Sequence, residues 1–149
     1  MILIECFNDE ELVKQLGFVK KQYKHMANKP AVVKGLRVES GIGIVDEDQE
    51  SDQPDDMKFY HIIDTVGSIK LKRKDSIRFL IVISPRLEEW IYIVARRNKI
   101  IPEDYGLPKE ARKLPKIPDH KFKEFLKILI ENNDSEIKTI RQSITETIQ

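Results

Sequence analysis

The sequence predicts an α/β protein in which a mostly parallel central sheet is flanked by helices and followed by a C-terminal helical tail. Short apolar runs alternate with segments of helical periodicity over the first 97 residues, as in parallel strands joined by crossover helices. The 149 residues are enough for one ordinary domain. We therefore expect a single domain, with a metal-binding α/β core over residues 1–98 and a connector and helices over residues 99–149 that pack on it.

The expected strands are compact apolar runs. The first is interrupted only by Glu5, and the run RFLIVI at 78–83 is the most apolar in the chain. The basic segment 69–74 fits either a hairpin partner of the preceding strand or a short helix. The strands expected from these runs span residues 2–7, 18–26, 42–45, 59–66 and 78–83.

The expected helices begin at capping residues or prolines. Asn8 or Asp9 caps the first helix, Pro30 suits the first turn of the second, and Pro85 precedes the third. Asp119 and Asp134 cap two further amphipathic helices near the C-terminus. These helices span about residues 9–16, 30–38, 86–97, 119–130 and 134–148, with an acidic loop at 49–56 and a proline-rich connector at 99–118.

Composition excludes several classes of protein. Hydrophobic residues make up 40% of the chain and charged residues 34%, which is too apolar for a disordered chain. No run approaches the roughly 20 apolar residues that span a bilayer, and no secretory signal is visible. The single cysteine, Cys6, excludes an internal disulfide and a multi-cysteine zinc site. We expect a soluble cytoplasmic protein that does not bind a membrane.

Charge is strongly patterned although the net charge is only +1. Residues 19–37 contain six lysines and arginines and no acid, whereas residues 46–56 contain seven acids and no base. Residues 70–78 are basic again. These blocks are either solvated faces and a loop, or carboxylates that hold a cation between basic segments that hold phosphate.

Carboxylates follow three of the expected strands. Glu5 stands near the end of the first strand, and Asp46 and Asp48 follow the third. Glu88 or Glu89 comes one helical turn after strand 78–83. Because the carboxyl ends of parallel strands meet at one edge of a sheet, adjacent strands would bring these side chains together. Oxygen ligands of this kind suit Mg²⁺ or Mn²⁺, and the i, i+2 spacing lets both aspartates face one ion.

These residues resemble the Toprim domain, the metal-binding module of topoisomerases, bacterial primases and small nucleases. The resemblance rests on Ile4-Glu5-Cys6 followed by Asp9, and on Asp46-Glu47-Asp48 after an apolar strand, and it covers about residues 1–95. It implies Glu5 as acid/base or metal ligand and Asp46 and Asp48 as ligands of the metal. The segment 84–90 is similar to one in nucleases of the OLD (overcoming-lysogenisation-defect) group, which implies Glu88 as a further ligand and a phage-defence context.

Two lysines are candidates for binding phosphate. Lys29 precedes a helix N-terminus, and such a terminus can hold an anion. Lys72 belongs to the basic cluster 70–74, which could track a nucleic-acid backbone. The alternatives are a plain surface loop at Lys29 and, for the cluster, a basic edge strand that prevents aggregation.

The carboxylates have plain structural alternatives too. Glu5 could be a buried acid with satisfied hydrogen bonds, because buried acids are seldom tolerated without partners. Asp46 and Asp48 could begin a solvated loop. Glu88 could simply favour the helix dipole as a first-turn acid.

The function we expect from the sequence is Mg²⁺-dependent phosphodiester cleavage or phosphoryl transfer on DNA or RNA by a small Toprim-type nuclease. Enzymatic activity stays open, because the same core could be a non-catalytic scaffold for a partner ATPase or nuclease. A partner, or a second copy of the chain, would then dock on the C-terminal helices. A third alternative is a receiver-like or phosphatase-like domain, although the order of its acids does not match either one.

Overall fold

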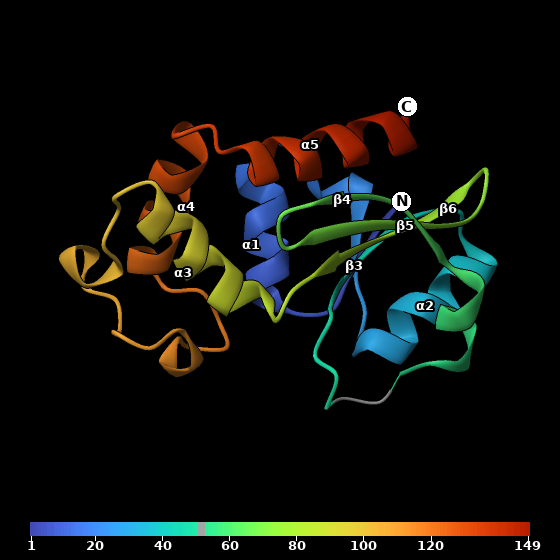
Figure 1. The fold of residues 1–149 in the computed structure, drawn as a ribbon, viewed down its shortest axis with the longest axis horizontal. Coiled ribbons are helices and arrows are strands. Elements are labelled where there is room, and N and C mark those ends of the chain that lie inside the picture. Colours follow the sequence, from blue (N-terminus) through green and yellow to red (C-terminus); the bar gives the residue numbers. More distant parts are fainter. Residues whose placement is uncertain (51–52) are drawn as a thin grey trace.

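A six-stranded mixed sheet forms the centre of the protein, which we describe from a computed structural model for residues 1–50 and 53–149 (Figure 1). The strand order is β2-β1-β3-β6-β5-β4. The strands are β1 (Ile2–Ile4), β2 (Tyr23–His25), β3 (Gly41–Asp46), β4 (His61–Val66), β5 (Ile69–Asp75) and β6 (Arg78–Ile83).

The sheet confirms the predicted α/β class with a mostly parallel sheet. Strands β2, β1, β3 and β6 pair in parallel, whereas β5 and β4 are antiparallel. The basic segment whose structure the sequence left open is therefore a hairpin strand, β5, rather than a short helix. Gly67 lies at the hairpin turn with φ +57°, a conformation that glycine adopts without strain.

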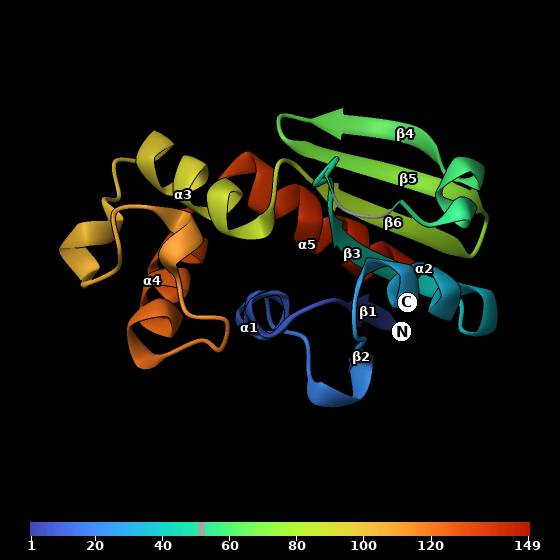
Figure 2. The ribbon, with the colours of Figure 1, turned by 90° about the horizontal axis from the view of Figure 1, so that it is seen from below.

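Helices cover both faces of the sheet and its carboxyl edge (Figures 1 and 2). Helices α1 and α5 lie on one face and α2 on the other, while α3 and α4 lie beyond the edge where the parallel strands end. The helices are α1 (Phe7–Gln15), α2 (Lys29–Val38), α3 (Leu87–Arg97), α4 (His120–Glu131) and α5 (Ser135–Ile148).

Capping explains where most helices begin. The Asp119 carboxylate accepts a hydrogen bond from Phe122 N at 2.9 Å, and that of Asp134 accepts one from Glu136 N at 2.9 Å, so both predicted caps are confirmed. Asn28 caps α2 by accepting from Ala31 N at 2.9 Å.

The first helix differs from the prediction. Helix α1 begins at Phe7, so Asp9 is its third residue and not its cap. The Asp9 carboxylate reaches back to accept from Cys6 N at 3.2 Å, which leaves room for only three residues in β1.

Two other segments are shorter or more ordered than the sequence suggested. The segment 18–26 contains a 3-10 turn before the three-residue strand β2, since its lysines are exposed rather than packed in the sheet. The predicted acidic loop 49–56 includes residues 51–52, which lie outside the described residues. Its end, with Asp56, belongs to a 3-10 helix. The 3-10 helices are Lys20–Gln22, Asp55–Phe59, Pro102–Tyr105 and Ala111–Lys113.

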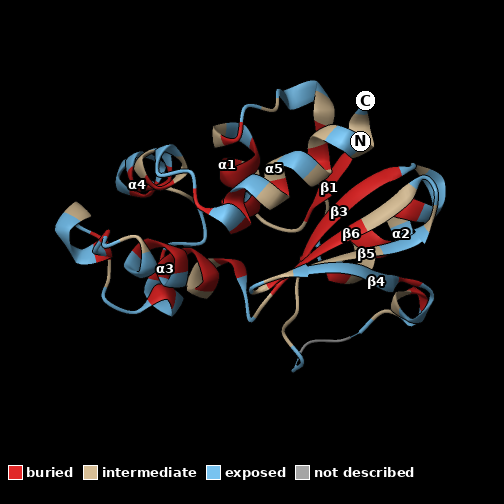
Figure 3. Ribbon diagram, turned by 45° about the horizontal axis from the view of Figure 1, so that its top comes forward, coloured by how far each residue is buried: buried red, intermediate tan, exposed pale blue. Residues whose placement is uncertain are grey.

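The core extends through both halves of the chain (Figure 3). Strands β1, β3 and β6 are buried, whereas β4 is exposed at the sheet edge. The apolar faces of α4 and α5 pack into this same core, so the predicted docking of a partner or a second copy on these helices would have to use their exposed faces and stays a prediction. No helix in the described ranges is both long and apolar enough to cross a membrane. The residues that α4 and α5 bury are Phe122, Phe125, Leu126, Leu129, Ile137, Ile140 and Ile144.

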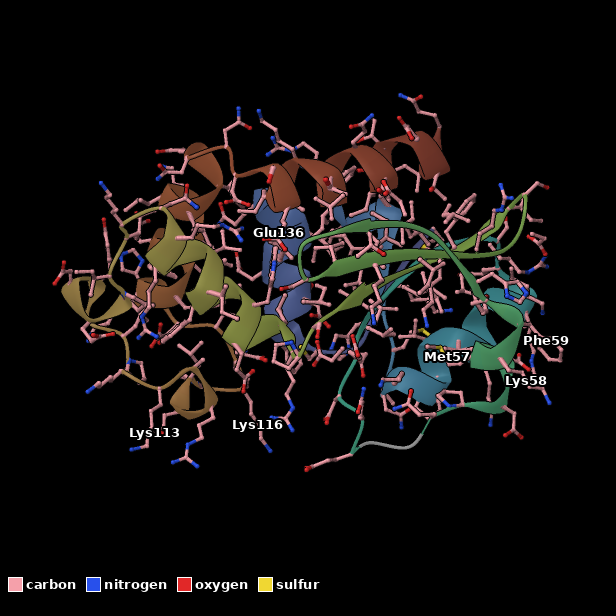
Figure 4. All side chains as sticks on the ribbon, viewed as in Figure 1. Met57, Lys58, Phe59, Lys113, Lys116 and Glu136 are labelled. Carbon is pink, nitrogen blue, oxygen red and sulfur yellow. The ribbon has the colours of Figure 1, made fainter. Side chains whose placement is uncertain are left out.

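An ion-pair group with two buried carboxylates joins α3 to the start of α5. Arg97 donates to Asp134 Oδ1 at 2.8 Å and also to Glu136 Oε2. The Glu136 side chain is only 3% exposed and lies against the β4–β5 turn, where Ser68 N donates to it at 2.6 Å (Figure 4). Removal of the arginine would leave two carboxylates with little solvent to stabilise them.

We predict that Arg97→Met lowers the free energy of unfolding by about 2–3 kcal/mol, because it leaves Glu136 buried without its cation. The matched control is Arg96→Met, since Arg96 contacts Glu103 at 3.4 Å in an exposed pair. That variant should lose less than about 1 kcal/mol. Chemical denaturation of both variants measures the difference, and equal losses would contradict the assignment.

Candidate active site

The ends of β1 and β3 and the first turn of α3 meet at one pocket. The strand order explains this, because β3 pairs with both β1 and β6, and α3 follows β6 directly. Glu5, Asp46 and Glu88 are thereby brought to a common cavity of about 520 Å³, although they are up to 83 residues apart in sequence. The residues that line it are Glu5, Cys6, Phe7, Asn8, His25, Asp46, Glu88, Lys116 and Ile117.

Two backbone amides hold the acidic side chains in place. Glu5 Oε2 accepts a hydrogen bond from Asp46 N at 3.0 Å. Asp46 Oδ1 in turn accepts one from Leu87 N at 2.9 Å, at the start of α3. These bonds link β1 to β3 and β3 to α3, and they fix the direction of both carboxylates.

Asp9 and Asn8 make hydrogen bonds with Glu5 and Glu88, and neither was predicted as a site residue. The side chain of Asp9 is 2% exposed, and its Oδ2 accepts from Glu5 N at 3.3 Å and Cys6 N at 3.2 Å. Asn8 Nδ2 donates to Glu88 Oε1 at 3.1 Å. Within the described residues, Oδ1 of Asp9 and Oδ1 of Asn8 are both buried without a hydrogen-bond partner. The Cys6-x-x-Asp9 capping spacing was the available signal for Asp9.

Burial and mutual repulsion raise the pKa of these acids. Burial raises the pKa of Asp46 to about 7, with further contributions from Glu5 and Glu88. Burial also raises the pKa of Glu5 above its usual range. Burial, with added repulsion from Asp46 and Glu5, raises the pKa of Asp9 well above its usual range. The site therefore carries more acid groups than it can ionise together at neutral pH.

Lys29 is the internal cation of the site. Its side chain is 4% exposed, and Nζ donates to the carbonyl oxygen of Glu47 at 3.0 Å. Its charge lowers the pKa of Glu5 and Asp46 but does not offset their burial. This placement supports charge compensation from within the fold, and its predicted contact with phosphate stays a prediction.

Asp48 does not lie alongside Asp46 as the i, i+2 spacing suggested. Its carboxylate pairs with Arg86, whose Nε and Nη2 lie 3.2 and 3.3 Å from its oxygens. Hydrogen bonding by Arg86 lowers the pKa of Asp48. Asp48 is still close enough to raise the pKa of Glu5, so it lies at the margin of the cluster. Its role as a ligand stays a prediction.

The two candidate glutamates of α3 have separate places. Glu88 lines the pocket and receives the hydrogen bond from Asn8, whereas Glu89 pairs with Arg86 at 3.5 Å. Of the two, Glu88 is thus the residue that the fold brings to Glu5 and Asp46.

Lys72 lies apart from this pocket. It lines a different, smaller pocket on β5 with Lys70, and Lys70 Nζ is 3.3 Å from a carboxylate oxygen of Glu47. The predicted phosphate contact of Lys72 therefore concerns another part of the surface.

Cys6 is not suited to nucleophilic chemistry. Burial raises the pKa of its thiol far above neutrality, and Asp9 raises it further. The thiol thus remains protonated, and the thiolate is the reactive form.

Carboxylate oxygens are the ligand type that a hard divalent cation prefers. As the side chains stand, the described part of the chain has no ready group of three or more histidine, cysteine or acidic residues that could hold a metal ion. Mg²⁺ needs only one or two direct carboxylates and keeps several waters. The Asp9 Oδ1 atom is buried without a hydrogen-bond partner among the described residues, and burial and mutual repulsion raise the pKa of Asp46 and Glu5. A bound cation would relieve that repulsion.

Sequence reasoning missed the contribution of the connector. Lys116 and Ile117 line the pocket, and the connector is tied to α1 by Asn8 Nδ2, which donates to Pro115 O at 3.4 Å. Phe7 and His25 were also missed as pocket residues. No local pattern marks these four residues, because the pocket arises from segments far apart in the chain.

Comparison with known proteins adds no relative. No protein-family model matches the chain, and no curated protein or solved structure is significantly similar to it.

We predict that Asp46→Asn raises the free energy of unfolding at pH 8 by about 1–3 kcal/mol. The folded carboxyl has a pKa of about 7, while an unfolded one ionises near pH 4. Between these values the folded state binds the extra proton, so this contribution to stability is lost as pH rises from about 4 to 7. The variant should resemble the wild type at pH 4 and exceed it at pH 8. Urea titrations across that range measure the difference.

Asp48→Asn is the matched control for this measurement. The folded pKa of Asp48 is lowered by Arg86, so the sign reverses and its contribution to stability is lost as pH falls. No stabilisation should appear at pH 8. Stabilisation of equal size in both variants would contradict the repulsion that we assign to Asp46.

Proposed function

We propose that the chain is a Mg²⁺-dependent enzyme that cleaves a phosphodiester bond in a nucleic acid. The observation that carries the proposal is the convergence of Glu5, Asp46 and Glu88 on one pocket at the carboxyl edge of parallel strands, with a pKa of about 7 at Asp46. An acid cluster of this kind gains stability when a divalent cation binds. Mn²⁺ would serve in place of Mg²⁺, because it also prefers oxygen ligands.

Glu5 and Asp46 are the residues that we propose to hold the ion, with Glu88 and Asp48 completing the set. A bound Mg²⁺ supplies positive charge that stabilises the charge developing on the phosphoryl group and favours ionisation of water. Glu5, whose pKa is raised, is placed to hold or move a proton at its Oε atoms. Lys29 lowers the pKa of Glu5 and Asp46 and so favours the ionised forms that would hold the ion.

The proposal includes the Toprim resemblance. The adjacency of β1 and β3 supports it, because these are the strands that carry Glu5 and Asp46. The position of Glu88 beside them supports the similarity to OLD-type nucleases. DNA and RNA are both candidate substrates for such a site.

We predict that Mg²⁺ raises the thermal unfolding temperature at pH 8, because binding to the folded state relieves the repulsion. Asp46→Asn should abolish most of this shift, and Asp64→Asn, which changes an exposed acid of β4, should leave it unchanged. Differential scanning fluorimetry with and without Mg²⁺ measures both. An unaltered shift in Asp46→Asn would place any bound ion elsewhere.

We predict that Glu88→Gln lowers metal-dependent cleavage at least tenfold, because it removes a negative charge that faces the metal, whereas Glu89→Gln leaves it within about twofold. The two residues are neighbours, but only Glu88 faces Glu5 and Asp46. Plasmid, single-stranded DNA and RNA would be incubated with each variant in Mg²⁺, Mn²⁺ and EDTA. The doubly substituted Asp46→Asn, Asp48→Asn chain is the inactive control. Cleavage that persists in this control would refute the proposed site.

A further inference from the structure

An exposed aromatic pair lines the pocket beside the acids. The rings of Phe7 and His25 are stacked with their centroids 4.7 Å apart and an interplanar angle of 20°. Phe7 opens α1 two residues after Glu5, and His25 ends β2, the neighbour of β1. Both side chains are exposed and both line the same cavity as Glu5 and Asp46.

This pair has no packing role that accounts for it. Phe7 remains 46% exposed and does not belong to either buried cluster of the core. Ile117, another wall residue of the cavity, is 67% exposed. The cavity thus combines apolar walls with an acidic region, which suits a ligand with a flat apolar part and a charged part.

Lys116 adds a cation to the wall of the pocket. Its side chain is exposed, and the backbone next to it is held by the hydrogen bond from Asn8 to Pro115 O. Lys116 also lines a second, adjoining pocket of about 210 Å³, together with Arg86, Arg112, Glu88 and Glu89. Arg86 pairs with Asp48 and Glu89, and Arg112 pairs with Glu110, whereas Lys116 makes no ion pair among the described residues.

We infer that this pocket binds single-stranded nucleic acid, with one unpaired base stacked on the Phe7–His25 pair and a neighbouring phosphate on Lys116. The inference rests on the function proposed above and specifies its substrate class. Base stacking on an exposed aromatic ring is sequence-tolerant, because every base has a π-face. In a duplex both faces of each base are covered by its neighbours, so a paired base cannot make this contact.

Binding rather than cleavage provides the test. Fluorescence anisotropy would compare three labelled DNA probes in Ca²⁺: an oligothymidine of about 12 nucleotides, an abasic strand of equal length, and a duplex. Ca²⁺ offers the acids a cation with oxygen preference. The wild type should bind oligothymidine roughly tenfold more tightly than the abasic strand, since one stacked base contributes on this scale.

Phe7→Ala and His25→Ala should each remove most of this preference for bases, whereas Phe7→Trp should keep it. The matched control is Phe59→Ala. Phe59 is 49% exposed, has Lys58 and Lys74 close to its ring, and lies at the end of the molecule remote from the connector (Figure 4). This control should bind all three probes like the wild type.

Lys116→Ala should weaken oligothymidine and the abasic strand by the same factor, and lower the salt dependence of binding by about 0.7 in log Kd against log salt. Lys113→Ala is its control, because Lys113 is an exposed lysine of the same connector that lies farther from the sheet in the view of Figure 4. Lys113→Ala should change neither quantity.

Several outcomes would overturn the inference: equal affinity for the abasic strand, preference for the duplex, an unchanged base preference in Phe7→Ala, or no binding at all. The proposed cleavage activity is refuted by a different result from the one that refutes this binding mode. A wild type that binds bases through Phe7 but never cuts would refute the nuclease and leave this binding mode intact.

Discussion

The hydrogen bonds from the backbone amides of Asp46 and Leu87 are the interactions on which the site depends. Glu5 accepts the first and Asp46 accepts the second, so the carboxylate of Glu5 is held by the backbone of β3 and that of Asp46 by the backbone of α3. The same bonds keep acids together whose burial and repulsion raise their pKa. The hydrogen bonds that order this edge of the sheet therefore hold Glu5 and Asp46 where their ionised forms are destabilised.

The surrounding cations do not remove that conflict. Lys29 donates to the carbonyl of Glu47, and Arg86 pairs with Asp48 and Glu89, which lie outside the innermost cluster. The negative charge of the acids is thus best compensated at the margin of the site, at Asp48 and Glu89, and least compensated around Asp46. This distribution favours a cation from solution at the innermost position, which is the role proposed for Mg²⁺. It also separates the site from the Arg97 group, where the arginine itself neutralises the buried acids.

Patterns local to the chain predicted most of the fold. The apolar runs predicted the parallel strands, and the caps Asp119 and Asp134 predicted where two helices begin. The adjacency of β1 and β3 in the sheet then brings Glu5 close to Asp46. The direction of Asp48 depends on its ion pair with Arg86, which lies 38 residues away in sequence. The start of α1 depended on whether Asp9 caps or reaches back, and the sequence allowed both.

The connector shows why the walls of the pocket escaped prediction. Proline spacing indicated turns between residues 99 and 118, but it does not show that Pro115 meets Asn8, which is 107 residues away in sequence. The same Asn8 amide nitrogen donates to Glu88, so one side chain contacts both the acidic part of the pocket and the connector that carries Lys116. A polyanion can approach buried carboxylates only where cations offset them. Lys116 offers such a charge on the protein, a bound metal would offer another, and the Phe7–His25 pair would add an attraction that does not depend on charge.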